Sequence, residues 1–189
     1  MRRSLAFDTA PDGYAFGVIR RLGHCEFEYE ESGGVTGLSK EEIVREARAL
    51  YQRVAPDLLA VEGFSGFVSS ARLLRMRRSL DISSLMDAAQ VTGMLVAALP
   101  SPQSTVTLPA NGANGDIHQW RYWLTGMYRQ GDKGVALALD RMLRGGLPRR
   151  GKRKDGTPIY AVDNHQRDAL GLALAAWLYT DYRQGPGRG

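Results

Sequence analysis

The sequence is poor in cysteine and has no apolar run long enough to cross a membrane. Cys25 is the only cysteine among 189 residues, which excludes an internal disulfide and a multi-cysteine zinc site and is compatible with a reducing compartment. The longest apolar runs, GMLVAAL and LGLALAAWLY, are too short for a bilayer. The N-terminal apolar stretch stops at Asp8, which argues against a secretory signal. We therefore expect a cytoplasmic protein that is not held in a membrane.

Length and composition are those of an ordinary globular chain. With 189 residues, of which 43% are hydrophobic, the chain can bury a sizeable core as one unit. No internal repeat or low-complexity tract is present. We predict a single domain over residues 1–182, followed by a flexible tail, RQGPGRG, over residues 183–189.

Positive charge is concentrated in two short segments. The formal net charge is +5 and the isoelectric point is near 9.6. RLLRMRR (72–78) holds four arginines, and RRGKRK (149–154) holds five basic residues, whereas EFEYEE (26–31) is acidic. Either basic segment alone could be a solvated, arginine-rich surface. Two of them in one small domain favour a polyanionic partner, and nucleic acid in particular, because arginine forks onto phosphate oxygens.

Hydrophobic periodicity and turn signals predict an α/β domain. Strands are expected over residues 4–10, 14–21, 25–30, 58–64 and 104–111. Helices are expected from a Ser39/Glu42 capping box up to Pro56, over residues 83–99 and 131–143, and within residues 161–177. Residues 145–158 are expected to form a basic flexible loop. The order βββαβαβ followed by helices predicts a five-stranded mixed sheet flanked by helices.

Four polar residues stand where these elements end or begin. Asp8 and Glu62 each close an apolar strand, and His165 and Asp168 lie three residues apart at the start of the last helix, so they project from one face. Open α/β sheets bind ligands at such strand ends. Carboxylates and imidazole are hard ligands suited to Mg²⁺ or Mn²⁺, and crowded acids without a cation would repel one another.

Each of these residues also has a structural interpretation. Asp8 could cap the turn DTAPDG, Glu62 could pair with an arginine such as Arg72, and His165 could be a core histidine bonded to backbone. Asp163, three residues before Gln166, fits a helix N-cap, and we keep that interpretation for it. The combination of two acids at strand ends with His-x-x-Asp at a helix start is what favours a metal site.

The order SLAFDTA, LLAVEGF and HQRDALGLALA resembles the RuvC family of Holliday junction resolvases, which have the RNase H-like fold. WRYWLTG followed by GDKGVALALDRML is similar to that family's segment before its last helix. The resemblance implies that Asp8, Glu62, His165 and Asp168 are catalytic metal ligands.

The resemblance also implies a mechanism and an assembly. Two Mg²⁺ ions about 4 Å apart, for which Mn²⁺ could substitute, would clamp the scissile phosphate. Asp8 would bridge the ions, Glu62 and Asp168 would bind one each, and His165 would ligate or position the water. The products would carry a 5′-phosphate and a 3′-hydroxyl. Cutting two opposed strands implies a homodimer, and the helix over residues 83–99, apolar on more than one face, is the candidate for its interface.

The chain departs from the family pattern in two places. The usual position of an aromatic wedge is taken by Ser65, between Phe64 and Phe67, and the usual lysine before TG is absent, with Arg121 the nearest cation. The DNA contacts that we expect are Phe64, Phe67, Arg72, Arg75, Arg77, Arg78, Arg121, Lys133, Arg149, Arg150, Lys152, Arg153 and Lys154.

The sequence leaves three functions open. The first is a Mg²⁺-dependent endonuclease that resolves four-way junctions, in the cytoplasm, at the nucleoid or in viral replication. The second is an RNase H-like nuclease that acts on other branched DNA, such as flaps, or on RNA–DNA hybrids. The third is a basic nucleic-acid-binding module whose acids are only structural. An actin-like ATPase would need glycine-rich phosphate loops, for which VEGFSGF is a poor candidate.

Overall fold

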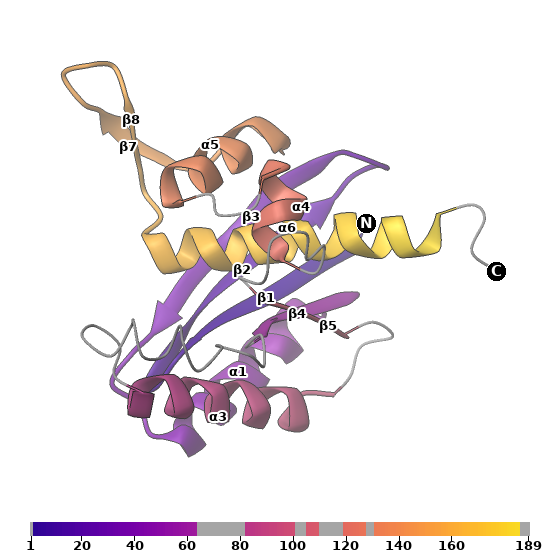
Figure 1. Cartoon of the computed structure of the whole chain (residues 1–189), viewed down its shortest axis with the longest axis vertical. Helices are drawn as coiled ribbons and strands as arrows, with labels where there is room; N and C mark the ends of the chain where they lie inside the picture. The colour runs from indigo at the N-terminus through magenta and orange to yellow at the C-terminus, as the bar shows by residue number, and fades with distance from the viewer. Residues whose placement is uncertain (1, 64–81, 101–104, 110–118, 128–130, 186–189) are drawn as a thin grey trace, which may run out of the picture.

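The computed structural model describes residues 2–63, 82–100, 105–109, 119–127 and 131–185 (Figure 1). A mixed sheet of six strands in the order β5-β4-β1-β2-β3-β6 runs through it. β1 pairs antiparallel with β2 and parallel with β4, and β4 pairs parallel with β5. The strands are β1 Arg2–Ala10, β2 Gly13–Arg21, β3 Phe27–Val35, β4 Leu58–Gly63, β5 Thr105–Pro109 and β6 Leu143–Arg144.

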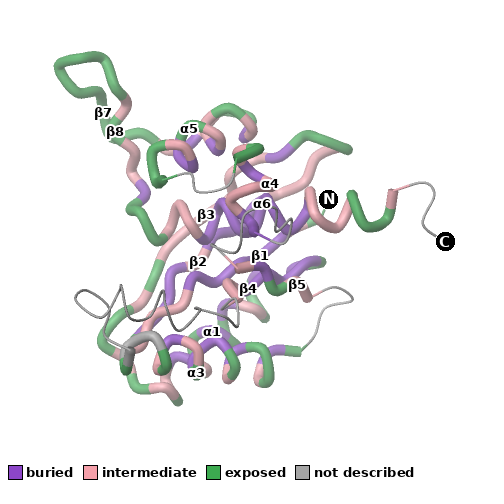
Figure 2. The backbone as a smooth tube through the Cα atoms, in the orientation of Figure 1, coloured by how far each residue is buried: buried purple, intermediate pink, exposed green. Residues whose placement is uncertain are grey.

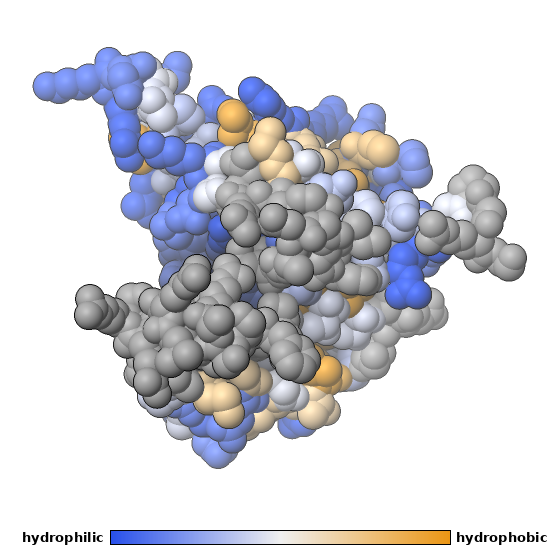
Figure 3. Space-filling model, in the orientation of Figure 1, coloured by the Kyte–Doolittle hydropathy of each residue, from blue (hydrophilic) through white to orange (hydrophobic). Residues whose placement is uncertain are grey.

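Helices cover both faces of this sheet. One face carries α1 and α3, and the other carries α4, α5 and α6 (Figure 1). A separate antiparallel hairpin, β7–β8, stands clear of the rest, with a hydrophilic surface (Figure 3). The bounds are α1 Lys40–Val54, α3 Ile82–Ala98, α4 Trp120–Thr125, α5 Asp132–Met142, β7 Arg149–Lys152, β8 Pro158–Tyr160 and α6 Asn164–Gln184.

The sheet separates two hydrophobic cores, which appear as the buried layers on either side of the strands (Figure 2). Leu5 and Phe7 of β1 belong to the core beneath α1 and α3, whereas Ala6, between them, belongs to the core beneath α6. This alternation follows from the two-residue repeat of a strand. Complete burial of a leucine or phenylalanine side chain contributes about 1.5–3 kcal/mol, so the apolar runs of the central strands specify the layered arrangement.

Helix α6 lies directly on the sheet because small residues meet at the contact. A Cβ atom at Gly17 of β2 would lie 2.6 Å from the backbone nitrogen of Leu170, so a side chain there would push the helix away. Residues 169–177 of α6 are all buried. This close contact brings the first turn of α6 towards the carboxyl end of β1, which is where the predicted site lies.

The structure confirms the predicted fold class and corrects several details. The sheet has six strands instead of five, because the two-residue strand β6 adds to β3. β3 begins at Phe27 and continues through Gly33 and Gly34, so Cys25 is exposed and lies outside the strand. Pairing with β2 carries the strand through glycines that local propensity places in a turn.

Two further corrections concern the C-terminal third. Residues 145–158 were expected to form a flexible loop. They contain the connection between β6 and β7 and most of the β7–β8 hairpin. The last helix runs to Gln184, so the first two residues of the expected tail are helical, while the boundary of the domain stays a prediction. In the described part of the chain, no helix is long and apolar enough to cross a membrane.

Candidate active site

Asp8 and Glu62 lie side by side at the carboxyl ends of two neighbouring parallel strands. The register of β1 and β4 aligns Phe7 with Val61, so the next residue on each strand is one of the two acids. Ala6 and Ala60, two positions earlier, lie in the core beneath α6, so both acids are on the face that α6 covers. The position is the edge of a parallel sheet at which α/β proteins bind ligands.

His165 reaches Asp8 from the first turn of α6. Its Nδ1 lies 2.9 Å from Asp8 Oδ2, and the imidazole side chain is 78% exposed. The hydrogen bond to Asp8 raises the pKa of His165, with further contributions from the charges of Asp8, Asp163 and Asp168. Nδ1–H therefore donates to the carboxylate, and Nε2 is the ring nitrogen that this bond does not use. The histidine is not the buried core residue of the structural interpretation.

Glu62 is a partly buried acid held between two partners. Burial raises the pKa of Glu62 well above its usual range, and a hydrogen bond to Asp8 and the charge of Asp8 raise it further. Trp120 Nε1 lies 3.4 Å from Glu62 Oε1, and this indole hydrogen bond lowers the pKa of Glu62 in part. Two carboxyl groups in such close contact cannot both be ionised at low cost unless a cation lies beside them.

Asp168 completes the group from the second turn of α6. Arg121 Nη2 donates to Asp168 Oδ2 at 2.7 Å, while Asp168 Oδ1 is buried without a hydrogen-bond partner in the described structure. Burial raises the pKa of Asp168, Arg121 lowers it, and the charge of Asp8 raises it again. Arg121 Nη2 is also 3.7 Å from Asp132 Oδ1, and the guanidinium carbon of Arg121 lies 5.1 Å from the centre of the Trp120 ring. One oxygen of Asp168 is thus held and the other is available.

The donor set fits a hard divalent cation at an open site. The group contains three carboxylates and an imidazole, two of its acids have raised pKa values, and the orphaned Asp168 Oδ1 is a buried acceptor without a donor. Within the described ranges, no three acidic, histidine or cysteine side chains converge closely enough to hold an ion by themselves. Mg²⁺ is commonly held by one or two carboxylates together with water and substrate phosphate. The ligand assignment therefore stays a prediction.

The predicted DNA contacts are distributed over three places. Six of them, namely Phe64, Phe67, Arg72, Arg75, Arg77 and Arg78, lie outside the described residues. Arg121 lies inside the site as the partner of Asp168, and Lys133 is exposed in the first turn of α5. The remaining five lie on the β7–β8 hairpin, where Arg149 donates to Asp140 at 2.7 Å. None of these assignments as DNA contacts is tested by the geometry.

Some residues of the site were not predicted from the sequence. Trp120 is fully buried and contacts Glu62, and Asp132, which accepts a hydrogen bond from Asn164 at 3.3 Å, lies near Arg121. The only feature of the sequence that points to these contacts is the Trp-Arg pair at the start of α4, which places an indole donor next to a cation. The pair does not reveal its partners, because Glu62 and Asp168 are distant in sequence.

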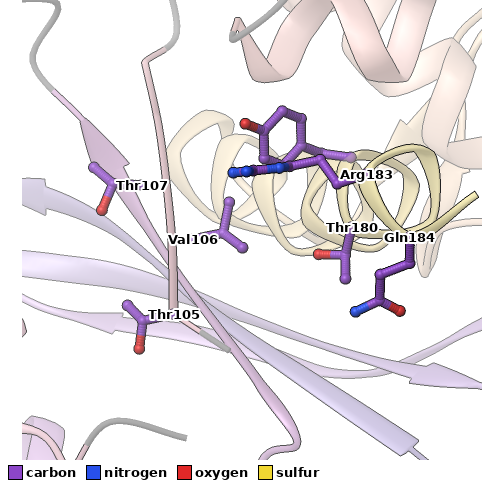
Figure 4. Close-up of a pocket in the computed structure, with 7 residues that line it drawn as sticks. Thr105, Val106, Thr107, Thr180, Arg183 and Gln184 are labelled. Atoms are coloured by element: carbon purple, nitrogen blue, oxygen red, sulfur yellow. The ribbon is translucent and has the colours of Figure 1, made fainter. Parts of the chain in front are cut away.

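A cavity of about 520 Å³ lies elsewhere, between β5 and the C-terminal part of α6 (Figure 4). Thr105, Thr107, Thr180, Arg183 and Gln184 are among its lining residues, and none of the four predicted ligands is. Thr105 begins β5, so the cavity opens towards the end of the parallel strands opposite to Asp8 and Glu62. It is therefore separate from the acidic site.

Comparison with known proteins confirms the fold. No protein-family model matches the sequence, and no curated protein matches it significantly. Thermus thermophilus RuvC is similar in structure, with a TM-score of 0.62, 16% identity and 96% of each chain covered. T. thermophilus RuvC in complex with a Holliday junction substrate has a TM-score of 0.57 and 17% identity, with 97% of each chain covered. The yeast mitochondrial Holliday junction resolvase Ydc2 has a TM-score of 0.60 and 10% identity, and the match covers 97% of this chain and 82% of the Ydc2 chain. The chain thus has the RuvC-type, RNase H-like fold.

Proposed function

We propose that this protein is a DNA endonuclease that resolves Holliday junctions by metal-dependent phosphodiester hydrolysis, nicking two opposed strands as a homodimer. The observation that carries the proposal is the meeting of Asp8, Glu62 and His165 at the carboxyl edge of the sheet, on a fold shared with two resolvases. A bare binding module would gain nothing from burying two carboxyl groups in mutual contact, since that arrangement destabilises a fold.

Asp8, Glu62, His165 and Asp168 would hold the cation, Mg²⁺ with Mn²⁺ as a substitute, and two ions per site suit this number of donors. A bound divalent cation supplies a Lewis acid that polarises a phosphoryl oxygen and lowers the pKa of water. The hydrogen bonds support this assignment for Asp168, because Arg121 engages one of its oxygens and leaves the buried Oδ1 for another ligand.

The chain's own groups account for proton movement and orientation. Asp8 fixes the imidazole of His165 through Nδ1, which leaves Nε2 either to help hold the cation or to position the attacking water. The hydrogen bond to Asp8 raises the pKa of His165 and so increases the affinity of the imidazole for a proton. Arg121 fixes Asp168 through Oδ2 and neutralises part of the negative charge that would otherwise repel a phosphodiester.

Helix α3 is the proposed dimer interface. One side of it is buried against the sheet through Val91 and Leu95. Met86 and Val96 remain exposed, at 67% and 42% of their surface, on a helix whose composition is largely apolar. A dimer that packs α3 against its copy would remove both side chains from water. A dimer would place two active sites on one four-way junction.

A panel of labelled substrates tests the proposal. The purified protein is incubated with a four-way junction, a linear duplex, a flap and an RNA–DNA hybrid, each with Mg²⁺ or with EDTA. We expect Mg²⁺-dependent paired nicks in the junction and little cleavage of linear duplex. Preferential cleavage of the flap or the hybrid would replace junction resolution by the related nuclease activity. Tight binding without cleavage of any substrate would identify a binding module.

A further inference from the structure

The β7–β8 hairpin has a defined shape. Arg149 pairs with Tyr160, Gly151 with Ile159 and Lys152 with Pro158 in antiparallel register. The tip is closed by two backbone hydrogen bonds, from Arg153 N to Thr157 O at 2.8 Å and from Gly156 N to Arg153 O at 3.0 Å. The basic segment is therefore a short two-stranded ribbon, and it projects from the domain (Figures 1 and 2).

This ribbon carries most of the net charge of the chain. Residues 149–160 contain five basic residues and one acid, a formal charge of +4, against +5 for the whole protein. In the described body of the domain, arginines are commonly neutralised, as Arg21 is by Asp181 at 2.8 Å. On the ribbon only Arg149 forms a salt bridge among described residues, and the exposed cations without one are Arg150, Lys152, Arg153 and Lys154.

The base of the ribbon is fixed to the domain by one carboxylate. Asp140 of α5 accepts from the backbone nitrogen of Leu147 at 3.0 Å and from Arg149 Nη2 at 2.7 Å. Gly146, at φ +71°, lies against this carboxylate, and a Cβ atom there would be 2.5 Å from Asp140 Oδ1. Ala161 N also donates to Pro148 O at 2.7 Å, which ties the two ends of the ribbon together. The direction of the ribbon is therefore set by folded structure.

The ribbon is joined directly to the active-site helix. Tyr160 ends β8, and His165 and Asp168 follow within the first two turns of α6. Figure 1 shows the hairpin standing off that end of α6. A ribbon of this length with its turn extends about 15–20 Å at roughly 3.3 Å per residue, which is less than one turn of duplex, about 34 Å. The ribbon is therefore short enough to stay within one turn of a duplex arm that leaves the site on this side.

We propose that the β7–β8 hairpin enters the major groove of the duplex arm that continues from the cut strand, and so helps to fix the junction on the enzyme. This inference rests on the proposed function. The major groove, about 12 Å wide, admits a two-stranded ribbon. Lys152, Arg153 and Lys154 supply cations for the flanking phosphates, and Ile159, 42% exposed, supplies an apolar contact of the kind that thymine methyl groups accept. Asp140 is the positioning residue of this contact.

The test is a chemical footprint on a bound four-way junction in Ca²⁺, so that binding is observed without relying on cleavage. Dimethyl sulfate modifies guanine N7 in the major groove. The full-length parent should protect guanines within about one helical turn of the crossover. Lys152→Gln/Lys154→Gln should lose that protection and bind about 10- to 60-fold more weakly at 0.1 M salt, from the loss of up to two phosphate contacts.

Two controls make the test specific. Arg45→Gln/Arg53→Gln removes the same charge from α1, on the opposite face of the sheet, and should keep the parent footprint. Replacing residues 149–160 by Gly-Gly removes the ribbon, and Pro148 and Ala161 are close enough to be joined. It should abolish the protection while the protein still melts cooperatively.

The outcomes separate the two proposals. A parent that binds and cuts the junction, with a footprint unchanged in the ribbon variants, overturns the hairpin assignment alone. Protection that is lost equally in the α1 control would show that binding depends on the total positive charge of the protein, and it would also overturn the hairpin assignment. A parent that neither binds nor cuts a four-way junction removes the proposed function, and the hairpin assignment with it.

Discussion

The carboxylate of Asp8 and the imidazole of His165, separated by 157 positions in the sequence, are in hydrogen-bond contact at 2.9 Å. The contact joins the carboxyl end of the first strand to the first turn of the last helix. Glu62 and Asp168 interact with Asp8 electrostatically from the neighbouring strand and the next helical turn. Every proposal about the chemistry depends on this contact between β1, β4 and α6.

Replacing His165 separates a chemical role from a structural one. His165→Ala should reduce Mg²⁺-dependent junction cleavage by about a hundredfold, the scale of general acid–base catalysis. Its thermal midpoint should stay within about 2 °C of the parent, because the side chain is largely exposed. His165→Asp should keep measurable cleavage, since a carboxylate is also a competent ligand. Normal cleavage by His165→Ala with a much lower midpoint would make the histidine a structural tether.

The pKa of Glu62 predicts how the stability of the metal-free protein depends on pH. Because its pKa is raised in the folded state, the folded protein is more stable with Glu62 neutral than with Glu62 ionised. The free energy of unfolding should therefore be highest below the ordinary pKa of glutamate and should fall as pH rises through the raised pKa. Glu62→Gln cannot ionise and should show a smaller fall, the rest coming from His165 and Asp168, whose pKa values are also raised.

Thermal midpoints from pH 4 to 9, in EDTA and in Mg²⁺, measure this effect. Added Mg²⁺ should restore stability at the high-pH end in the parent and much less in Glu62→Gln. A parent and a variant with parallel pH profiles would show that Glu62 is not the partly buried acid described.

Trp120 tunes Glu62 through its indole N–H. Trp120→Phe keeps an aromatic ring but removes the donor, which should raise the pKa of Glu62 further and shift the ascending limb of the cleavage-versus-pH profile to higher pH. Trp177→Phe is the matched control, because Trp177 is equally buried in the same core and its Nε1 has no partner in the described structure. Equal profiles for the two variants would exclude the tuning role.

Asp140 should affect where the hairpin lies without affecting its charge. Asp140→Ala removes both hydrogen bonds at the base and leaves all five cations of the hairpin in place. We expect junction affinity within about threefold of the parent, since phosphate contacts dominate affinity, but a weaker and broader dimethyl sulfate footprint. Asp140→Glu should retain part of the footprint. An unchanged footprint in Asp140→Ala would show that the hairpin is positioned by other contacts.

The candidate acids could be predicted because their signals are local. Asp8 and Glu62 end apolar runs, and parallel pairing of those runs places their ends together. His165 and Asp168 share a helix face through their three-residue spacing. The Asp163/Gln166 capping box also follows from spacing alone, and the structure contains it. In each case the position of the residue is encoded within a few neighbouring residues, while its chemical role stays a prediction.

The contacts that tune the site could not be predicted, because they join elements through tertiary packing. Trp120 and Glu62 are 58 positions apart, and Arg121 and Asp168 are 47 apart. The segment WRYWLTG does not indicate which face of so short a helix packs against the sheet. The hairpin was missed for a related reason. Glycine and charge in residues 145–158 are typical of a loop, whereas its pairing depends on Asp140 of another element.

The most direct test of the account is cleavage of a synthetic four-way junction by Asp8→Asn, beside the parent and Asp12→Asn. Asp12 is the control because it is an exposed acid in the turn after the same strand. Loss of the Asp8 carboxylate should lower Mg²⁺-dependent cleavage by about a thousandfold or more, while junction binding stays equal or becomes tighter as repulsion of phosphate is reduced. Asp12→Asn should cut like the parent. Cleavage by Asp8→Asn within a few-fold of the parent would contradict the account.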